Sequence, residues 1–195
     1  MSDWVATAEA LSMRLTERFQ LFLRGFCLAG LMCSVCVTST AQAERGSHIT
    51  LDKPLPQPAW ELPLIANGAG TITDSTYLGR VTYVDFWASW CGPCRLSLPA
   101  LNRLSKEFDA ADFGVVAISV DYVDEDALDF LKRYPVDYPV AIDRTGNSGR
   151  DFAVAGMPSG YLIGRDGLIR EVHVGFRKGD EALLREQIQA LIADS

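Results

Sequence analysis

Two cysteines separated by two residues, Cys91 and Cys94, are the side chains of this sequence best suited to chemistry. A thiol pair at this spacing can close a short disulfide and reopen it, which is the reaction of thiol–disulfide exchange. The same spacing also supplies half of a zinc site, but such a site needs four ligands. The other three cysteines lie near the N-terminus, in a segment that we expect to be removed, and the two histidines are far apart. We therefore expect redox chemistry and no metal.

The segments on either side of the pair predict how it is positioned. An apolar run with the composition of a β-strand, residues 81–87, precedes it, and a helical pattern follows from Pro93 to about residue 108. Cys91 then falls at the N-terminal edge of a helix, where unpaired N–H groups and the helix dipole favour its thiolate. Pro93 fits the first helical turn without loss of a hydrogen bond. Gly92 leaves the approach to the sulfur free of a side chain.

The first 43 residues have the pattern of a secretory signal. Three arginines precede an apolar run at residues 25–37, and small residues ending in Ala41-Gln42-Ala43 follow. The apolar run is shorter than the roughly 20 residues of a membrane-spanning helix. We expect residues 1–43 to be a signal peptide that is cleaved after Ala43; the alternative is an uncleaved membrane anchor. Cleavage leaves Cys91 and Cys94 as the last two cysteines.

Composition narrows the function further. The chain has 195 residues, a net charge of −7 and 48% hydrophobic residues, which suits one globular domain with an appendage. The acidic balance argues against nucleic acid as a partner. Exported domains usually use cysteines as structural staples. A disulfide between Cys91 and Cys94 would close a very short loop and add little stability, so we expect the pair to serve chemistry.

The order of the remaining segments predicts the fold. Residues 44–58 are polar and proline-containing and are predicted to be a linker to a domain at residues 59–195. Within the domain we expect a hairpin at 60–65 and 71–73, a buried strand at 113–120, a helix from Asp126, a short strand at 140–142, a helical segment at 150–154, a second hairpin around Asp166-Gly167 and a last helix at 180–193. This alternation indicates an α/β fold with a central mixed sheet flanked by helices.

The segment Asp85-Phe86-Trp87-Ala88-Ser89-Trp90-Cys91-Gly92-Pro93-Cys94 resembles the active-site segment of the thioredoxin superfamily. A proline five residues after the second cysteine, Pro99, is a further feature of that superfamily. The signal sequence, the N-terminal β-hairpin and an extra strand–helix insertion between residues 115 and 143 are similar to the exported TlpA/ResA-like branch. The resemblance implies a thioredoxin-like fold and a thiol–disulfide oxidoreductase that needs no cofactor.

The resemblance also implies roles for individual residues. Cys91 would attack a substrate disulfide and Cys94 would resolve the mixed disulfide. Asp85 would exchange a proton with Cys94, because burial raises the pKa of a carboxylate; the alternative is a strand-end aspartate that reaches water. Trp90, Gly92 and Pro93 would shape the surface beside Cys91. The superfamily's cis-proline matches Pro158, and the backbone of Met157 before it would pair with an extended substrate.

Some residues depart from the pattern of the branch or lie outside it. Ser97 stands where the branch often has a glutamate, and Ser159 replaces the usual threonine after the proline. His48 and His173 are far from the motif in sequence, so we expect surface or strand residues rather than catalysts. The acidic run at residues 121–129 is expected to be a solvated helix start.

The Gly-Pro spacer matches thioredoxin, which predicts a reductant of protein disulfides. Together with the signal sequence, this predicts an exported, periplasmic reductant. The resemblance implies a membrane electron donor of the DsbD or CcdA type, and substrates such as the haem-binding CxxC segments of apocytochromes or copper-site cysteines. Contact with the membrane is expected only through an uncleaved anchor. The alternatives are a copper-binding metallochaperone that uses the same two cysteines and a periplasmic disulfide isomerase.

Overall fold

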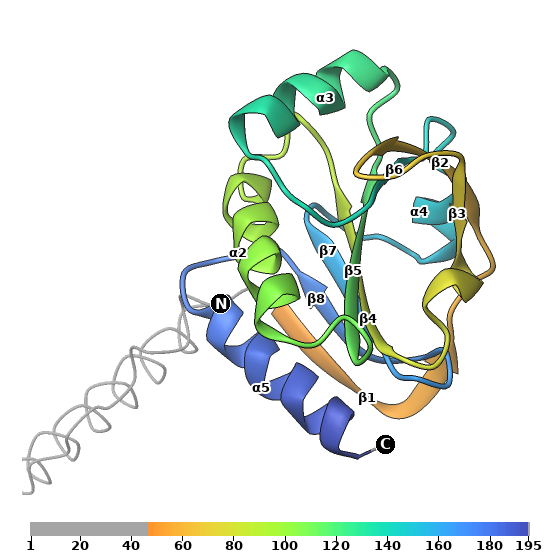
Figure 1. The fold of residues 1–195 in the computed structure, drawn as a ribbon, viewed down its shortest axis with the longest axis vertical. Helices are drawn as coiled ribbons and strands as arrows, with labels where there is room; N and C mark the ends of the chain where they lie inside the picture. The colour runs from red at the N-terminus through yellow and green to blue at the C-terminus, as the bar shows by residue number, and fades with distance from the viewer. Residues whose placement is uncertain (1–46, 195) are drawn as a thin grey trace, which may run out of the picture. The chain divides into compact units, whose positions relative to one another are not determined.

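The computed structural model describes residues 47–194. Their strands form one mixed sheet in the order β1-β8-β7-β4-β5-β6-β2-β3 (Figure 1). The strands are β1 (Ser47–Pro56), β2 (Glu61–Ala66), β3 (Thr71–Thr73), β4 (Val81–Trp87), β5 (Phe113–Ser119), β6 (Val140–Ile142), β7 (Ser159–Ile163) and β8 (Leu168–Val174). The helices are the 3-10 helix η1 (Asp74–Tyr77), α2 (Cys94–Glu107), α3 (Asp124–Arg133), α4 (Asn147–Asp151) and α5 (Asp180–Ala193).

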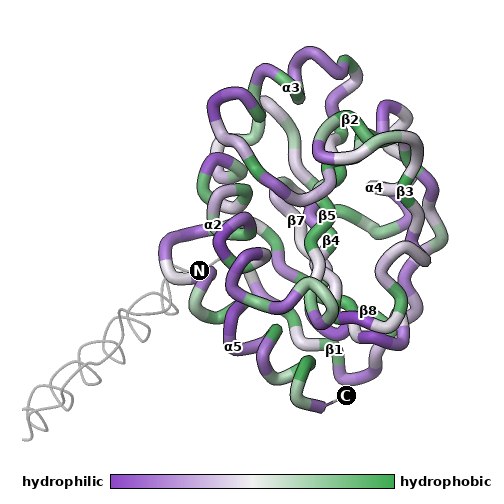
Figure 2. Tube along the Cα trace, viewed as in Figure 1, coloured by the Kyte–Doolittle hydropathy of each residue, from purple (hydrophilic) through white to green (hydrophobic). Residues whose placement is uncertain are grey.

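The centre of the sheet is the pair β4 and β5, whose residues are all buried. The two strands run parallel, with Val81 opposite Phe113 and Trp87 opposite Ser119. A central parallel strand is covered on both faces, which explains the continuous apolar composition of both segments. Figure 2 shows this concentration of hydrophobic residues along the middle of the sheet. Asp85 is the exception within β4.

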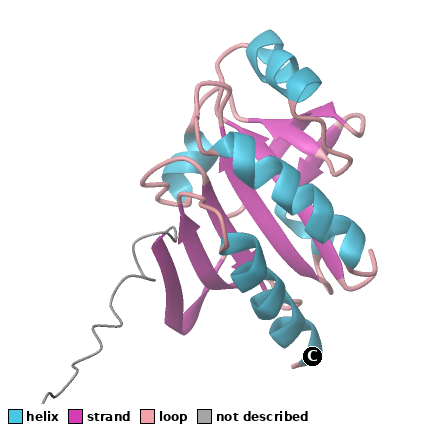
Figure 3. Cartoon of the chain, turned by 90° about the vertical axis from the view of Figure 1, so that its left-hand side faces the viewer, coloured by secondary structure: helices cyan, strands magenta, loops and turns pink. Residues whose placement is uncertain are grey.

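Helices cover the two faces of the sheet in an unequal way. The helices α2, α3 and α5 contribute their buried residues to one core cluster, which also contains Cys91 and Cys94. The second cluster, on the other face, contains Tyr77 of η1 and Phe152 beside α4. Figure 3 shows α2 and α5 lying across the same face of the sheet. The motif cysteines therefore belong to the face that carries the longer helices.

The expected α/β, thioredoxin-like architecture is confirmed. The N-terminal hairpin is present as β2 and β3, and it extends the sheet because β2 also pairs with β6. The second hairpin, β7 and β8, and the last helix lie where they were predicted. The helical segment α4 begins three residues earlier than expected, since the Asp143 carboxylate accepts hydrogen bonds from the N–H groups of Ser148 and Gly149 at its start.

The predicted linker at residues 44–58 is wrong over most of its length. Residues 47–56 form β1, which pairs antiparallel with β8, with His48 opposite His173. The prolines of this segment are tolerated because β1 is an edge strand with a neighbour on one side. The register shifts between Thr50 and Leu55.

The expected signal peptide at residues 1–43 lies outside the described residues. None of the helices described between residues 47 and 194 has the length and hydrophobicity of a membrane-spanning segment.

Candidate active site

Cys91 and Cys94 are joined by a disulfide at the N-terminus of α2. The helix begins at Cys94, Pro93 is its N-cap residue, and no acidic side chain lies in its first turn. The backbone N–H of Cys94 donates a hydrogen bond to Cys91 Sγ at 3.2 Å. Cys91 is 4% exposed and Cys94 is fully buried. The sulfur of Cys91 thus faces the positive end of the helix and is the more accessible of the two, as expected.

The turn before the cysteines is held by Asp121, a residue whose role the sequence did not reveal. Its carboxylate accepts hydrogen bonds from the Ser89 N–H at 2.9 Å, the Ser89 hydroxyl at 2.8 Å and the Ser119 hydroxyl at 2.8 Å. Asp121 is 3% exposed, so its assignment to a solvated helix start was wrong. We call these contacts of Asp121 with Ser89 and Ser119 the Asp121 clamp. In the sequence, the two serines that donate to Asp121 are the signal from which it could be predicted. This clamp ties the motif to the end of β5.

Asp85 is buried in the middle of β4, with 1% of its surface exposed. Side chains alternate along a strand, so Asp85 shares its face with Tyr83 and Trp87, which belong to the same core cluster as the two cysteines. Its Oδ2 has no hydrogen-bond partner among the described residues. Burial raises the pKa of Asp85 well above its ordinary value. The alternative of a carboxylate in water at a strand end is thereby overturned.

The peptide bond between Met157 and Pro158 is cis, as the resemblance implied. Met157 packs against the core cluster that contains the cysteines. Met157 also lines a hollow of about 330 Å³ together with Trp90, Tyr122 and residues at the start of α4. Trp90 is 69% exposed and Tyr122 is 83% exposed. Apolar surface therefore lies beside the disulfide and is available to a partner.

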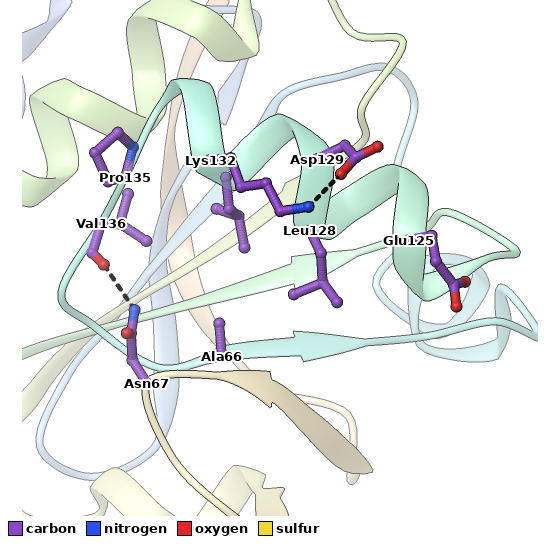
Figure 4. Close-up of a pocket in the computed structure, with 9 residues that line it drawn as sticks. Ala66, Asn67, Glu125, Leu128, Asp129, Lys132, Pro135 and Val136 are labelled. Atoms are coloured by element: carbon purple, nitrogen blue, oxygen red, sulfur yellow. Dashed lines mark hydrogen bonds and ion pairs between the residues drawn. The ribbon is translucent and has the colours of Figure 1, made fainter.

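A second hollow, of about 450 Å³, lies between α3 and the end of β2 (Figure 4). Leu128 and Val136 contribute to its apolar floor, and an ion pair of Lys132 with Asp129 at 2.7 Å crosses its rim. The Asn67 side chain donates a hydrogen bond to the Val136 carbonyl at 2.7 Å and holds its margin. None of the residues proposed for redox chemistry lines this hollow.

The two histidines occupy places that the sequence only partly indicated. Both lie on strands, and their rings stack at a centroid distance of 4.9 Å. His173 is 6% exposed, and its Nε2 has no hydrogen-bond partner among residues 47–194. His48 Nε2 lies 2.7 Å from Glu171 Oε2. His173 is thus a buried strand residue rather than a surface one.

Comparison with known proteins agrees with this geometry. The Redoxin family model matches residues 51–188. The chain belongs to the Redoxin family. The thiol:disulfide interchange protein DsbE of Pseudomonas aeruginosa is 34% identical over 139 residues, which cover 70% of this chain and 73% of that protein.

Two further relatives of this Redoxin-family protein carry related names. The thiol-disulfide oxidoreductase ResA of Bacillus thuringiensis is 30% identical over 114 residues, covering 58% of this chain and 62% of ResA. A crystal structure assigned as a thiol:disulfide interchange protein DsbE from Chlorobium tepidum is 41% identical, with a TM-score of 0.68, and covers 73% of this chain and 99% of that one. The protein is a DsbE/ResA-like thiol–disulfide oxidoreductase of the TlpA/ResA-like branch.

Proposed function

We propose that this oxidoreductase is an exported, periplasmic reductant of protein disulfides in which Cys91 attacks the substrate. The single observation that carries the proposal is the placement of the Cys91 sulfur against the N–H of Cys94 at the start of α2. Hydrogen bonds and dipoles directed at a sulfur stabilise its thiolate, and the thiolate is the nucleophile of disulfide exchange. A Gly-Pro spacer, as in thioredoxin, further supports a reducing role.

The two cysteines would act in sequence. The Cys91 thiolate attacks one sulfur of a substrate disulfide, forms a mixed disulfide and releases the other substrate sulfur as a thiolate. The Cys94 thiol then loses its proton and attacks Cys91, which frees the second substrate thiolate and leaves the disulfide Cys91–Cys94. Asp85 would accept the Cys94 proton, since a buried carboxylate with a raised pKa exchanges protons near neutral pH.

The surface beside Cys91 suits an extended polypeptide. Trp90 and Tyr122 supply exposed aromatic area, and the hollow next to them reaches Met157 at the cis bond. An extended segment that paired with the Met157 backbone could place an apolar side chain in this hollow, a mode of recognition that uses main-chain hydrogen bonds for affinity. Gly92 and Pro93 carry no long side chain that would block the approach of a substrate to the Cys91 sulfur. The proposed substrates are cysteine pairs of apocytochromes or of copper sites.

A reductant in an oxidising compartment must be reduced again, so the proposal includes a membrane electron donor of the DsbD or CcdA type. In that compartment the protein is placed by the signal peptide proposed at residues 1–43, or held at the membrane if that segment stays uncleaved. The donor would attack the same Cys91–Cys94 disulfide in the reverse sequence of steps.

The reduction potential of the chain that begins at Glu44 tests the direction of electron flow. We expect a value near that of thioredoxin, about −270 mV, and turnover in the reduction of insulin. Cys91→Ser should abolish turnover, whereas Cys94→Ser should accumulate a mixed disulfide with insulin. A potential above about −180 mV would make the protein an isomerase or an oxidase. Stoichiometric copper binding without insulin turnover would instead favour the metallochaperone.

A further inference from the structure

One row of the sheet brings ionisable residues of three strands into line. In the antiparallel registers, Asp85 of β4 lies opposite Gly160 of β7, Gly160 opposite His173 of β8, and His173 opposite His48 of β1. Residues directly opposite each other in neighbouring strands project from the same face. Asp85, His173 and His48 therefore share one face of the sheet, and that face also carries α2 and α5.

A tyrosine hydroxyl fills the gap that Gly160 leaves in this row. A Cβ atom at Gly160 would lie 1.8 Å from the Tyr83 hydroxyl oxygen, so the phenol crosses the strand at the point where a side chain would stand. The Tyr83 ring centroid is 6.1 Å from that of His173, which is 4.9 Å from that of His48. The phenol thus lies between the Asp85 and His173 positions. Any residue other than glycine at position 160 would displace it.

The row begins in the protein interior and ends at solvent. Asp85, Tyr83 and His173 are buried, and Asp85 Oδ2 and His173 Nε2 are both without hydrogen-bond partners among the residues described. Buried polar atoms of this kind are the usual sites of ordered water. The His48 side chain, at the sheet edge, is 27% exposed and pairs with Glu171.

The middle of the row is electrically neutral near pH 7. Burial, together with the nearby carboxylates of Asp85 and Asp180, raises the pKa of Tyr83. Burial lowers the pKa of His173 to about 4, with a further lowering from His48 that the side chain of Gln187 on α5 opposes. Neutral hydroxyl and imidazole groups can pass a proton on without trapping it as a fixed charge.

We propose that Tyr83, His173 and His48 form a proton route between Asp85 and the solvent at the β1 edge. The inference rests on the proposed role of Asp85 as the acceptor of the Cys94 proton. A polypeptide docked over Trp90 and Met157 would cover the mouth of the site. Asp85 then needs a path to water that the substrate does not close.

The proton balance of the resolving step is as follows. The Cys94 S–H bond breaks and Asp85 gains the proton, while the Cys94 sulfur bonds to Cys91 and the electron pair of the mixed disulfide leaves with the substrate thiolate. The Asp85 carboxyl then gives its proton to the Tyr83 oxygen as Tyr83 gives its own to His173. His173 passes one proton to His48 and so to water, with ordered water bridging wherever side chains do not touch. No residue of the row changes oxidation state.

The test measures how fast the mixed disulfide resolves. The reduced full-length protein is mixed with insulin or with a small disulfide, 2-hydroxyethyl disulfide, between pH 6 and 9, and the reaction is stopped with acid and alkylated. We expect Tyr83→Phe, which keeps the ring, to slow resolution of the insulin adduct by about tenfold or more, a modest loss for a proton-transfer group. With the small disulfide, which leaves the mouth open, the variant should match the wild type.

Tyr138→Phe is the matched control, since Tyr138 is a buried tyrosine whose pKa is also raised by the charge of Asp85. Its hydroxyl donates to the Leu98 carbonyl at 3.2 Å, and it is not part of the row. It should resolve insulin at the wild-type rate. His48→Ala, a change at a partly exposed site, should be slow with insulin and regain its rate on addition of imidazole. A merely structural loss would not respond to imidazole.

The outcomes separate the two proposals. Suppose that Asp85→Asn resolves insulin slowly. If Tyr83→Phe then resolves it at the wild-type rate, or if Tyr83→Phe and Tyr138→Phe lose rate equally, the route is overturned and the proposed function of Asp85 stands. A wild-type rate for Asp85→Asn with both disulfides would instead remove Asp85 from the proposed function, and the route with it.

Discussion

At the scale of single residues, the burial of Asp85 lowers the stability of the folded protein at neutral pH. An ionised carboxylate in a buried strand loses its hydration, and Asp85 Oδ2 gains no hydrogen bond from the described residues in return. Burial raises the pKa of Asp85, so between the unfolded and folded pKa values the folded protein binds more protons than the unfolded chain. Stability from this group is complete at pH values below the unfolded pKa of about 3.9 and is lost as the pH rises through the folded pKa.

Asp85→Asn should therefore raise the free energy of unfolding at pH 7. The gain is about 1.4 kcal/mol for each pH unit between the unfolded pKa and the folded pKa, counted no further than pH 7, and it should fade as the pH approaches 4. Urea unfolding at pH 7 and at pH 4 measures it. A variant that is no more stable than the wild type at pH 7 would contradict the burial cost.

Asp121→Asn is the matched comparison, since Asp121 is equally buried but accepts hydrogen bonds from Ser89 and Ser119. Replacing one carboxylate oxygen by an NH₂ group removes an acceptor, so this variant should lose about 1–3 kcal/mol at pH 7. Opposite signs for the two substitutions would show that hydrogen bonding, rather than burial alone, decides whether the core tolerates a carboxylate. Equal signs would show that it does not.

The sequence separation of the contacting residues explains which site residues the sequence could reveal. Cys91, Cys94 and Pro158 can be proposed from the sequence because their spacing or local motif is visible within a few residues. Asp85 can be proposed because it is a polar residue inside an apolar run. The Asp121 clamp joins segments more than 30 residues apart, and only the parallel pairing of β4 with β5 brings Ser89 and Asp121 together.

At the scale of elements, local patterns predicted those strands and helices whose own residues carry the signal. The continuous apolar runs of β4 and β5 and the helical periodicity of α2 and α5 are of this kind. The strand β1 was mistaken for a linker because its prolines and polar residues have no local β pattern. Its partner, β8, lies more than 110 residues later in the chain, and β8 supplies the hydrogen bonds. Pairing over such a separation leaves little trace in a short window of sequence.

The pairing of β1 with β8 has a pH-dependent consequence. His173 is enclosed between His48 of β1, Tyr83 of β4 and Gln187 of α5, and burial lowers its pKa to about 4 from 6.5. The unfolded chain thus binds the proton more readily, so stability is complete above pH 6.5 and is lost as the pH falls towards 4.

His173→Leu should remove this loss, which amounts to about 3 kcal/mol over that interval. The measurement is urea unfolding of both proteins at pH 7 and pH 4.5. Parallel losses of stability for the two proteins on acidification would show that His173 is not the group responsible.

At the scale of the whole molecule, the redox state of one short disulfide is linked to the stability of the entire domain. The folded protein, the unfolded chain and their oxidised and reduced forms make a closed thermodynamic cycle. If the fold favours the disulfide more than the unfolded chain does, the potential of the folded protein is more negative and the oxidised form is the more stable one. A strong oxidant has the opposite relation, because its reduced form is stabilised by the fold.

A reductant must therefore unfold at higher urea when oxidised than when reduced. The difference should be about 1.4 kcal/mol for each 30 mV by which the folded potential lies below that of the unfolded chain. Entropy of loop closure adds little to it, since only two residues separate Cys91 and Cys94. Unfolding with and without excess dithiothreitol measures the difference, and the double variant Cys91→Ser, Cys94→Ser should show none. Greater stability of the reduced protein would reverse the proposed direction of electron flow, while leaving the assignment as a thiol–disulfide oxidoreductase in place.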